Sequence, residues 1–383
     1  MQADWCRENN IEYIVHLNHE DQLQSLIKSE GDYFNNMRYV GVPGVDAIWS
    51  QIWMDHVADY PKLASSAAHL FGKPRAFTES FAAYTYRPTV PQAKWVLDYQ
   101  LVRGVNFVQI MFMSASTSRP GSTQGAISTS TPAVAPRNTS FFMSDTFPPV
   151  AQYINRATFL LSQGRPVCKI GLYYPTSAMW YGDNEANTAT LSIAQQLMEQ
   201  QRDFDFVDEQ SLSSIFTPDK GSMKNLSGAS YQAIIVPPSI IIPGAVISKL
   251  QQFASSGGKV IFLGTTPSLL KGKNFFAASK TEDPAWAIKE PSGKISPTVL
   301  ELLPKPDLKL DKQCPVIKYI HRKWNDADLY FIFNEGKENQ SFNVLLEAKG
   351  KAQIWDAMTG EIVTLQGTIN KNDTIEVPLK FDP

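Results

Sequence analysis

The apolar and polar positions of residues 1–113 form a repeat in which short apolar runs alternate with helical stretches. Strand and helix follow each other at intervals of about 30 residues, which is typical of a parallel sheet built from βα units. The runs that predict strands are residues 11–17, 38–42, 76–77 and 105–113. A helix over residues 148–162 completes a fourth unit after a loop rich in Ser, Thr, Pro and Gly. Four units are half of what a closed (β/α)8 barrel needs.

A second alternation of strands and helices begins at Arg165 and predicts a flavodoxin-like α/β domain. Its strands are predicted at residues 167–174, 205–207, 232–236 and 259–264. Its first turn, Pro175 to Ser177, lacks the GxGxxG pattern of a dinucleotide site. Beyond residue 276 the helical signal fades, and six short strands separated by turn signals predict a β-sandwich. We therefore expect an α/β fold with three domains: a partial (β/α) barrel over 1–165, the flavodoxin-like domain over 166–275 and the β-sandwich over 276–383.

Composition narrows the function classes. The 35 basic and 37 acidic residues give a net charge of −2, which provides no electrostatic case for binding nucleic acid or an anionic membrane. Aromatic residues make up 11% of the chain. This content suits either sugar binding, because sugar rings stack on aromatic faces, or a large core. Three widely spaced cysteines indicate neither a zinc site nor a disulfide framework.

Three carboxylates follow or end predicted strands: Glu20, Asp46 and Glu79. The carboxyl ends of parallel barrel strands meet at one rim, and glycoside hydrolysis needs two carboxyl groups across the scissile bond. Such a carboxylate can also simply cap the next helix, and Asp46 after a Pro-Gly pair is a candidate for that role. We predict Glu79, Glu20 and Asp46 as catalytic residues, in that order.

Other polar and aromatic side chains surround these carboxylates in the sequence. His16 and His19 flank the end of the first strand, where a neutral imidazole can bind a sugar hydroxyl or a metal. Their spacing only superficially matches a zinc motif, so no metal ligands are assigned. The predicted substrate-binding residues are His16, His19, Trp49, Trp53, Asp55 and Tyr84. Helix packing explains the tryptophans equally well.

Several segments together resemble glycoside hydrolase family 106, the α-L-rhamnosidase-like enzymes of gut Bacteroidota. They are HLNHED, MRYVGVPGVDAIW, GKPRAFTESFAAY, AKWVLDYQLVRGVN and YINRATFLLSQGRP. The resemblance implies a (β/α)8 catalytic barrel followed by accessory domains, and an oligosaccharide or glycan as substrate. It also implies an inverting mechanism with strand-end glutamates, foremost Glu79, and a calcium ion near the sugar. Val105 to Ser116 contains no histidine where many relatives carry one, which departs from the family pattern.

The resemblance also implies that four barrel strands precede this segment in full-length relatives. We therefore expect a truncated form with little activity alone, and open edge strands that favour self-association or pairing with a missing N-terminal half. The alternative is a non-catalytic glycan-binding or scaffold remnant. The N-terminus lacks the features of a signal peptide. Full-length relatives are periplasmic or exported, so the sequence leaves the localisation open.

Overall fold

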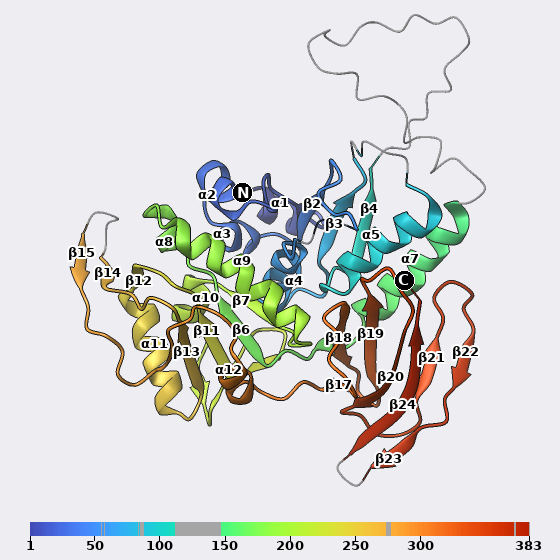
Figure 1. Ribbon diagram of the computed structural model, residues 1–383. Coiled ribbons are helices and arrows are strands. Elements are labelled where there is room, and N and C mark those ends of the chain that lie inside the picture. The colour runs from blue at the N-terminus through green and yellow to red at the C-terminus, as the bar shows by residue number, and fades with distance from the viewer. Residues whose placement is uncertain are drawn as a thin grey trace, which may run out of the picture.

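The computed structural model describes residues 1–54, 56, 58–82, 84, 88–111, 147–272, 277–370 and 373–382. Figure 1 shows a mixed α/β structure in which an N-terminal sheet, a central sheet and a group of C-terminal strands follow one another. None of the described helices is both long and apolar enough to cross a membrane.

The N-terminal sheet is parallel and has the strand order β1-β2-β3-β4. Its strands are β1 Ile14–Val15, β2 Val42–Ala47, β3 Phe77–Ser80 and β4 Phe107–Ile110. The accompanying helices are α1 Gln2–Glu8, α2 Leu23–Glu30, α3 Tyr33–Met37, α4 Pro61–Leu70, α5 Val90–Leu101 and α7 Phe147–Ser162. Because β1 and β4 each pair on one side only, the described strands do not close into a barrel.

The position of β2 corrects the sequence analysis. We expected the second strand to end at Val42 and the following Pro-Gly pair to make a turn, yet β2 begins at Val42 and continues to Ala47. Gly44 is required inside this strand because a Cβ there would lie 2.0 Å from the ring of Phe77 on β3. Glycine thus serves a close approach between neighbouring strands here. Asp46 consequently lies within a strand, and the idea that it caps a helix is wrong.

The central sheet contains five parallel strands in the order β16-β13-β11-β6-β7. They are β6 Ile170–Tyr173, β7 Asp205–Val207, β11 Ala233–Val236, β13 Lys259–Leu263 and β16 Ile288–Glu290. In chain order this is the 2-1-3-4-5 arrangement of flavodoxin-like sheets. Its helices are α8 Thr176–Trp180, α9 Asn184–Glu199, α10 Glu209–Ser214 and α11 Gly244–Ser255. Two small sheets flank it: β8 Pro218–Asp219, β9 Ser222–Lys224 and β10 Ser230–Tyr231; and β12 Ile241–Pro243, β14 Leu269–Lys271 and β15 Ala278–Lys280.

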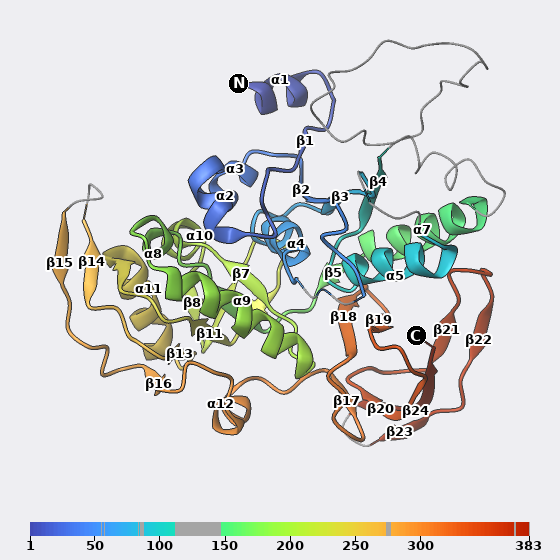
Figure 2. The same cartoon turned by 45° about the horizontal axis from the view of Figure 1, so that its top comes forward.

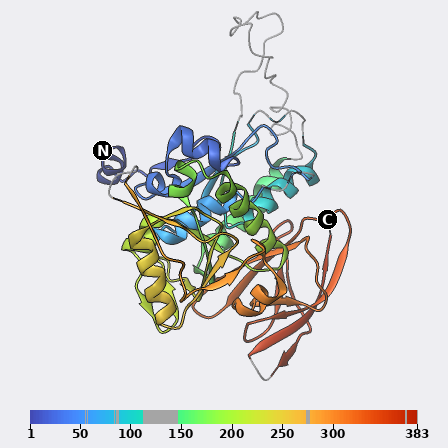
Figure 3. The same cartoon turned by 60° about the vertical axis from the view of Figure 1, so that its left-hand side comes forward.

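The C-terminal strands form two facing sheets and a separate hairpin. One sheet holds β17 Leu308–Leu310, β20 Gln340–Leu346, β24 Thr374–Phe381 and β23 Thr368–Asn370. The other holds β19 Asp328–Asn334, β18 Ile317–Lys323 and β5 Arg165–Pro166, and the hairpin is β21 Gln353–Trp355 with β22 Ile362–Thr364. A buried apolar cluster with members on β17, β18, β20 and β24 joins the two sheets. Helix α12 Pro297–Leu302 precedes all of these strands except β5, and Figure 3 shows the C-terminal strands gathered on one side of the molecule.

Helix α4 connects the first two sheets. Figures 1 and 2 show it between β2 and β3 on one side and β6 and β7 on the other, and all ten of its residues are buried. Two of its charged side chains cross the interface: Lys62 Nζ lies 2.7 Å from Asp203 Oδ1, and His69 Nδ1 lies 2.8 Å from Asp205 Oδ1. A buried helix that carries paired charges in this way fixes the relative position of the two sheets.

Candidate active site

The candidate site begins with a row of polar side chains across the N-terminal sheet. Strand register places Asp46 on β2 opposite Glu79 on β3, and Glu79 opposite Gln109 on β4. Residues in register share a face, and neighbours along a strand point to opposite faces. Thr78 bonds to Gln100 of α5. Therefore Asp46, Glu79 and Gln109 lie on the face of the sheet that α5 does not cover.

His16, one residue beyond β1, completes this group. Its Nδ1 lies 2.8 Å from the carbonyl oxygen of Leu17, and its Nε2 lies 3.4 Å from Glu79 Oε2. A carbonyl oxygen only accepts, so Nδ1 carries a proton, and Nε2 either donates to the Glu79 carboxylate or accepts from its protonated form. One nitrogen or oxygen atom from each of His16, Asp46 and Glu79 lies within 4.8 Å of the others. Side-chain exposures of 27% for His16 and 18% for Glu79 leave both accessible to a ligand.

Asp46 has a pKa well above the ordinary value of an aspartate. Burial raises its pKa to about 6; His16 opposes this rise and the neighbouring Glu79 carboxylate adds to it. The buried Asp46 Oδ1 has no hydrogen-bond partner in the described part of the chain. An unsatisfied buried acceptor is costly, so Asp46 gains stability by holding a proton or by binding a donor group.

Glu20 lies close enough to Asp46 for their charges to interact, in the turn after β1 rather than at a strand end. It is 2% exposed, and its Oε1 accepts a hydrogen bond of 2.7 Å from the backbone N–H of Leu17. Burial raises its pKa to about 8, against the lowering effect of its backbone hydrogen bonds, and the Asp46 charge contributes to the rise. Glu20 is therefore protonated at neutral pH.

The backbone around the cluster adopts unusual conformations. Four residues after the strands have a positive φ although none is glycine: His19 (66°), Trp49 (51°), Ser50 (58°) and Phe81 (73°). Bulky residues rarely occupy this region, and such conformations concentrate at functional sites. The turn is held by hydrogen bonds from Trp49 N to Ala82 O and from Phe81 N to Ala47 O. These bonds join the ends of β2 and β3 into one rim.

The structure brings together only some of the predicted site residues. It gathers His16, Asp46 and Glu79, with Glu20 adjacent, whereas His19 and Trp49 are exposed at the rim. Trp53 packs edge-on against Tyr84, which is buried and donates to the carbonyl oxygen of Ile52. Asp55 lies outside the described residues.

Sequence reasoning did not include Gln109 among the candidates. Its position is evident only from the register with Glu79, because one amide in an apolar run carries no signal of its own.

The cluster does not match the calcium ion that the family resemblance implies. Calcium takes six to eight oxygen ligands. The described cluster provides two carboxylates and an imidazole, a donor set closer to that of a transition metal. No step of the chemistry below is therefore assigned to calcium.

Known proteins resemble this chain both in sequence and in fold. A family model described as alpha-L-rhamnosidase matches residues 3–369. A protein of Formosa agariphila provisionally named beta-glucuronidase is 26% identical over 381 residues, which cover 94% of this chain and 30% of that protein. The rhamnosidase from Novosphingobium sp. PP1Y has a similar fold, with a TM-score of 0.70 and 18% identity over 100% of this chain and 37% of that one.

A GH42 beta-galactosidase from G. stearothermophilus is a more distant structural match, with a TM-score of 0.56 and 13% identity over 91% of this chain and 61% of that one. This chain thus spans about a third of the length of the Formosa and Novosphingobium proteins. Since the family model covers nearly the whole chain, the protein belongs to glycoside hydrolase family 106, the alpha-L-rhamnosidase family.

Proposed function

We propose that this chain carries a carboxylate pair that hydrolyses a glycosidic bond in a rhamnose-containing plant or complex glycan. The observation that carries the proposal is the register of Asp46 and Glu79 on adjacent parallel strands, with His16 against Glu79. We further propose that the four-stranded sheet corresponds to the C-terminal half of a (β/α)8 barrel. Strand ends on one rim are where such barrels place catalytic groups.

The two carboxyl groups have different environments, which suggests different roles. Burial and the Glu79 charge favour the protonated form of Asp46, with a pKa of about 6. In this proposal Asp46 protonates the leaving oxygen, while Glu79, which lies beside His16, acts on the anomeric carbon or on water. Glu20 stays protonated near Asp46 and positions the Leu17 segment that holds His16.

The spacing of the pair bears on the stereochemistry. Carboxyl groups about 5 Å apart serve retaining glycosidases, and inverting ones need about 6.5–9.5 Å to admit a water. The Asp46 and Glu79 ligand atoms lie within 4.8 Å of each other, which favours retention if these two residues form the catalytic pair. The family resemblance implies inversion, which would instead pair Glu79 with a more distant carboxylate. The anomer of the first-formed sugar, followed by NMR, separates these assignments.

The direct test is hydrolysis of 4-nitrophenyl α-L-rhamnopyranoside and of a panel of rhamnose-containing oligosaccharides by chain 1–383. We expect Glu79→Gln to lower kcat by about 1,000-fold, because the charged carboxylate is replaced by a neutral amide. The unfolding temperature should change little, because the two side chains have the same size. Glu8→Gln on the exposed helix α1 is the matched control and should retain full activity. Equal activity in Glu79→Gln and the unsubstituted chain would refute the proposal.

The second candidate function is glycan binding without turnover. The observation that favours it is the open sheet, since the described strands do not close around the cluster. In that case the chain binds oligosaccharides from the panel but releases no sugar, and Glu79→Gln alters the binding affinity alone.

A further inference from the structure

Gln109 shares the face of the carboxylate pair, and the proposed chemistry leaves it without a role. Asp46, Glu79 and Gln109 are each the second-to-last residue of their strands, β2, β3 and β4. Strand register places Glu79 between the other two. Neighbouring strands lie about 4.8 Å apart. The Gln109 side chain therefore leaves the sheet one strand spacing from that of Glu79, on the side away from Asp46.

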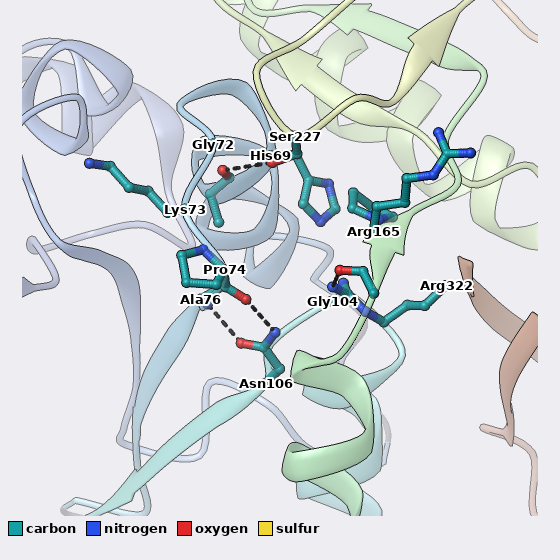
Figure 4. Close-up of a pocket in the computed structure, with 13 residues that line it drawn as sticks. His69, Gly72, Lys73, Pro74, Ala76, Gly104, Asn106, Arg165, Ser227 and Arg322 are labelled. Carbon is teal, nitrogen blue, oxygen red and sulfur yellow. Dashed lines mark hydrogen bonds between the residues drawn. The ribbon is translucent and has the colours of Figure 1, made fainter. Parts of the chain in front are cut away.

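Asn106, three residues before Gln109, fixes this register at the other end of the strands. Its side chain is buried, and its Nδ2 donates to the carbonyl oxygens of Pro74 and Leu161, each at 3.1 Å. Its Oδ1 accepts from the backbone N–H of Ala76 at 2.8 Å. Figure 4 shows the two bonds that reach the segment leading into β3. A slip of one residue would break these bonds and turn Gln109 to the opposite face of the sheet.

The opposite face of β3 and β4 is already occupied. Thr78 Oγ1 donates to the amide oxygen of Gln100 on α5 at 2.6 Å, and Val108 and Ile110 pack against the buried core. Gln109 itself is exposed, and its amide bonds to no group in the part of the chain that the structure describes. A donor and an acceptor beside the carboxylate pair are thus available to a ligand.

The chemistry of a glycosidic carbon indicates which group this amide meets. In the proposed function, on which this inference rests, Glu79 acts at the anomeric carbon or on the water that attacks it. Two ring atoms flank that carbon: the ring oxygen, and C2 with its hydroxyl group. The ring oxygen gains positive charge in the oxocarbenium-like transition state, so an N–H donor aimed at it is unfavourable. The 2-hydroxyl group both donates and accepts, and hydrogen bonds to it strengthen in the transition state.

We propose that Gln109 binds the 2-hydroxyl group of the sugar in the catalytic subsite and thereby determines the class of substrate. The chain then accepts pyranosides with a free 2-hydroxyl group. It rejects 2-deoxy sugars, which lack the partner group, and sugars substituted at O2, in which the substituent covers it. A neutral amide suits this position, because a third carboxylate beside Asp46 and Glu79 would add repulsion between like charges.

The test compares 4-nitrophenyl α-L-rhamnopyranoside with its 2-deoxy analogue. Gln109→Met keeps the length of the side chain and removes the amide, and Gln251→Met, at an exposed position on α11, is the matched control. We expect Gln109→Met to lower kcat/KM on the rhamnoside by about 100-fold, mainly through kcat, and to leave the 2-deoxy analogue within about twofold. Gln251→Met should leave both values unchanged. Equal losses on the two substrates, or no loss on either, overturn the proposal.

Sugar binding separates a failure of the Gln109 assignment from a failure of the proposed function. If the unsubstituted chain hydrolyses neither substrate, the proposed function fails, and calorimetric titration with L-rhamnose and 2-deoxy-L-rhamnose tests Gln109 on its own. We expect Gln109→Met to weaken rhamnose binding about fivefold and to leave binding of the 2-deoxy sugar unchanged. In that case, equal rhamnose affinity of the variant and the unsubstituted chain, or no binding of either sugar, overturns the assignment.

Discussion

Two groups of buried acidic side chains in this protein have opposite surroundings. At the interface between the N-terminal and central sheets, Asp203 and Asp205 face Lys62 and His69. At the carboxyl end of β2, Asp46 is buried beside another carboxylate, Glu79. Burial acts to raise the pKa of both interface acids. The pKa of Asp203 stays raised although Lys62 lowers it, whereas at Asp205 the charges and hydrogen bonds of His69, Lys62 and Tyr231 together outweigh burial and the net shift is downward. For Asp46 burial dominates and the pKa rises to about 6.

The difference separates acids that hold the fold together from acids that are available for chemistry. A nearby cation stabilises the charged form of a buried carboxylate, and at Asp205 this effect outweighs burial. A carboxylate buried without a cation of its own is poised to take up or release a proton. A further buried cluster links the N-terminal part to the C-terminal strands, where Arg103 bonds to Asp59 and Glu335. The following experiments test this division.

Arg103→Met should give the largest effect. It leaves Asp59 without its buried partner and leaves Glu335 with Lys318 alone, so we expect the free energy of unfolding to fall by about 3–5 kcal/mol. Arg75→Met is the matched control, since Arg75 pairs with Glu12 at the surface and such pairs contribute about 0–1 kcal/mol. Denaturant unfolding measures both. Equal losses in the two variants would show that the interface pairs do not stabilise the fold in this way.

Glu20→Gln should change the pH dependence of stability. The folded-state pKa of Glu20 is about 8, above its ordinary value, so the folded chain binds this proton more tightly than the unfolded chain. Stability from this group is therefore complete below about pH 4.5 and is lost progressively as the pH rises toward 8. The amide keeps the hydrogen bond to Leu17 without ionising, so the variant should be more stable at pH 7 by about 3 kcal/mol.

Unfolding in urea between pH 5 and pH 8 provides the measurement for Glu20→Gln. The variant and the unsubstituted chain should differ least at pH 5 and separate steadily above it. Glu8→Gln on α1 serves as the control, since Glu8 is exposed. A constant difference between the two chains across this range would show that Glu20 does not titrate with folding.

Asp46→Asn tests the proton donor. If Asp46 protonates the leaving group, kcat/KM of the unsubstituted chain should fall about tenfold per pH unit above about pH 6. Asp46→Asn should lower kcat by about 100-fold and remove this dependence. An unchanged alkaline limb in the variant would transfer the acid role to another residue.

Trp49→Ala should give the smallest effect. The ring is 64% exposed at the rim, three residues beyond Asp46, and the backbone that carries it is held by the bond to Ala82. A stacked sugar contributes about 1 kcal/mol, so oligosaccharide affinity measured by calorimetry should fall about fivefold. Trp5→Ala, on the exposed α1, is the control and should bind normally. If the two variants bind alike, Trp49 does not contact the sugar.

Sequence patterns predicted many of the elements. Strand β7 and helix α11 occupy the expected residues, and the parallel βα rhythm of the N-terminal part is present as expected. Local patterns suffice here because apolar periodicity reports burial directly. The pattern misled at β2, since Pro43 and Gly44 normally mark a turn. Whether a glycine serves a turn or the close approach of a neighbouring ring depends on Phe77, which lies 33 positions further along the chain.

The sequence by itself determined that carboxylates lie near strand ends, and it carried the family resemblance. Tertiary structure alone decided which of those carboxylates lie together, because strand register and the face on which each side chain points are not local properties. It brought Asp46 and Glu79 to the same level beside His16, buried Glu20 near Asp46, and left His19 exposed. It also paired Asp205 with His69 across 136 positions of sequence. The charge state of each acid follows from these neighbours, because burial and nearby charges set a pKa.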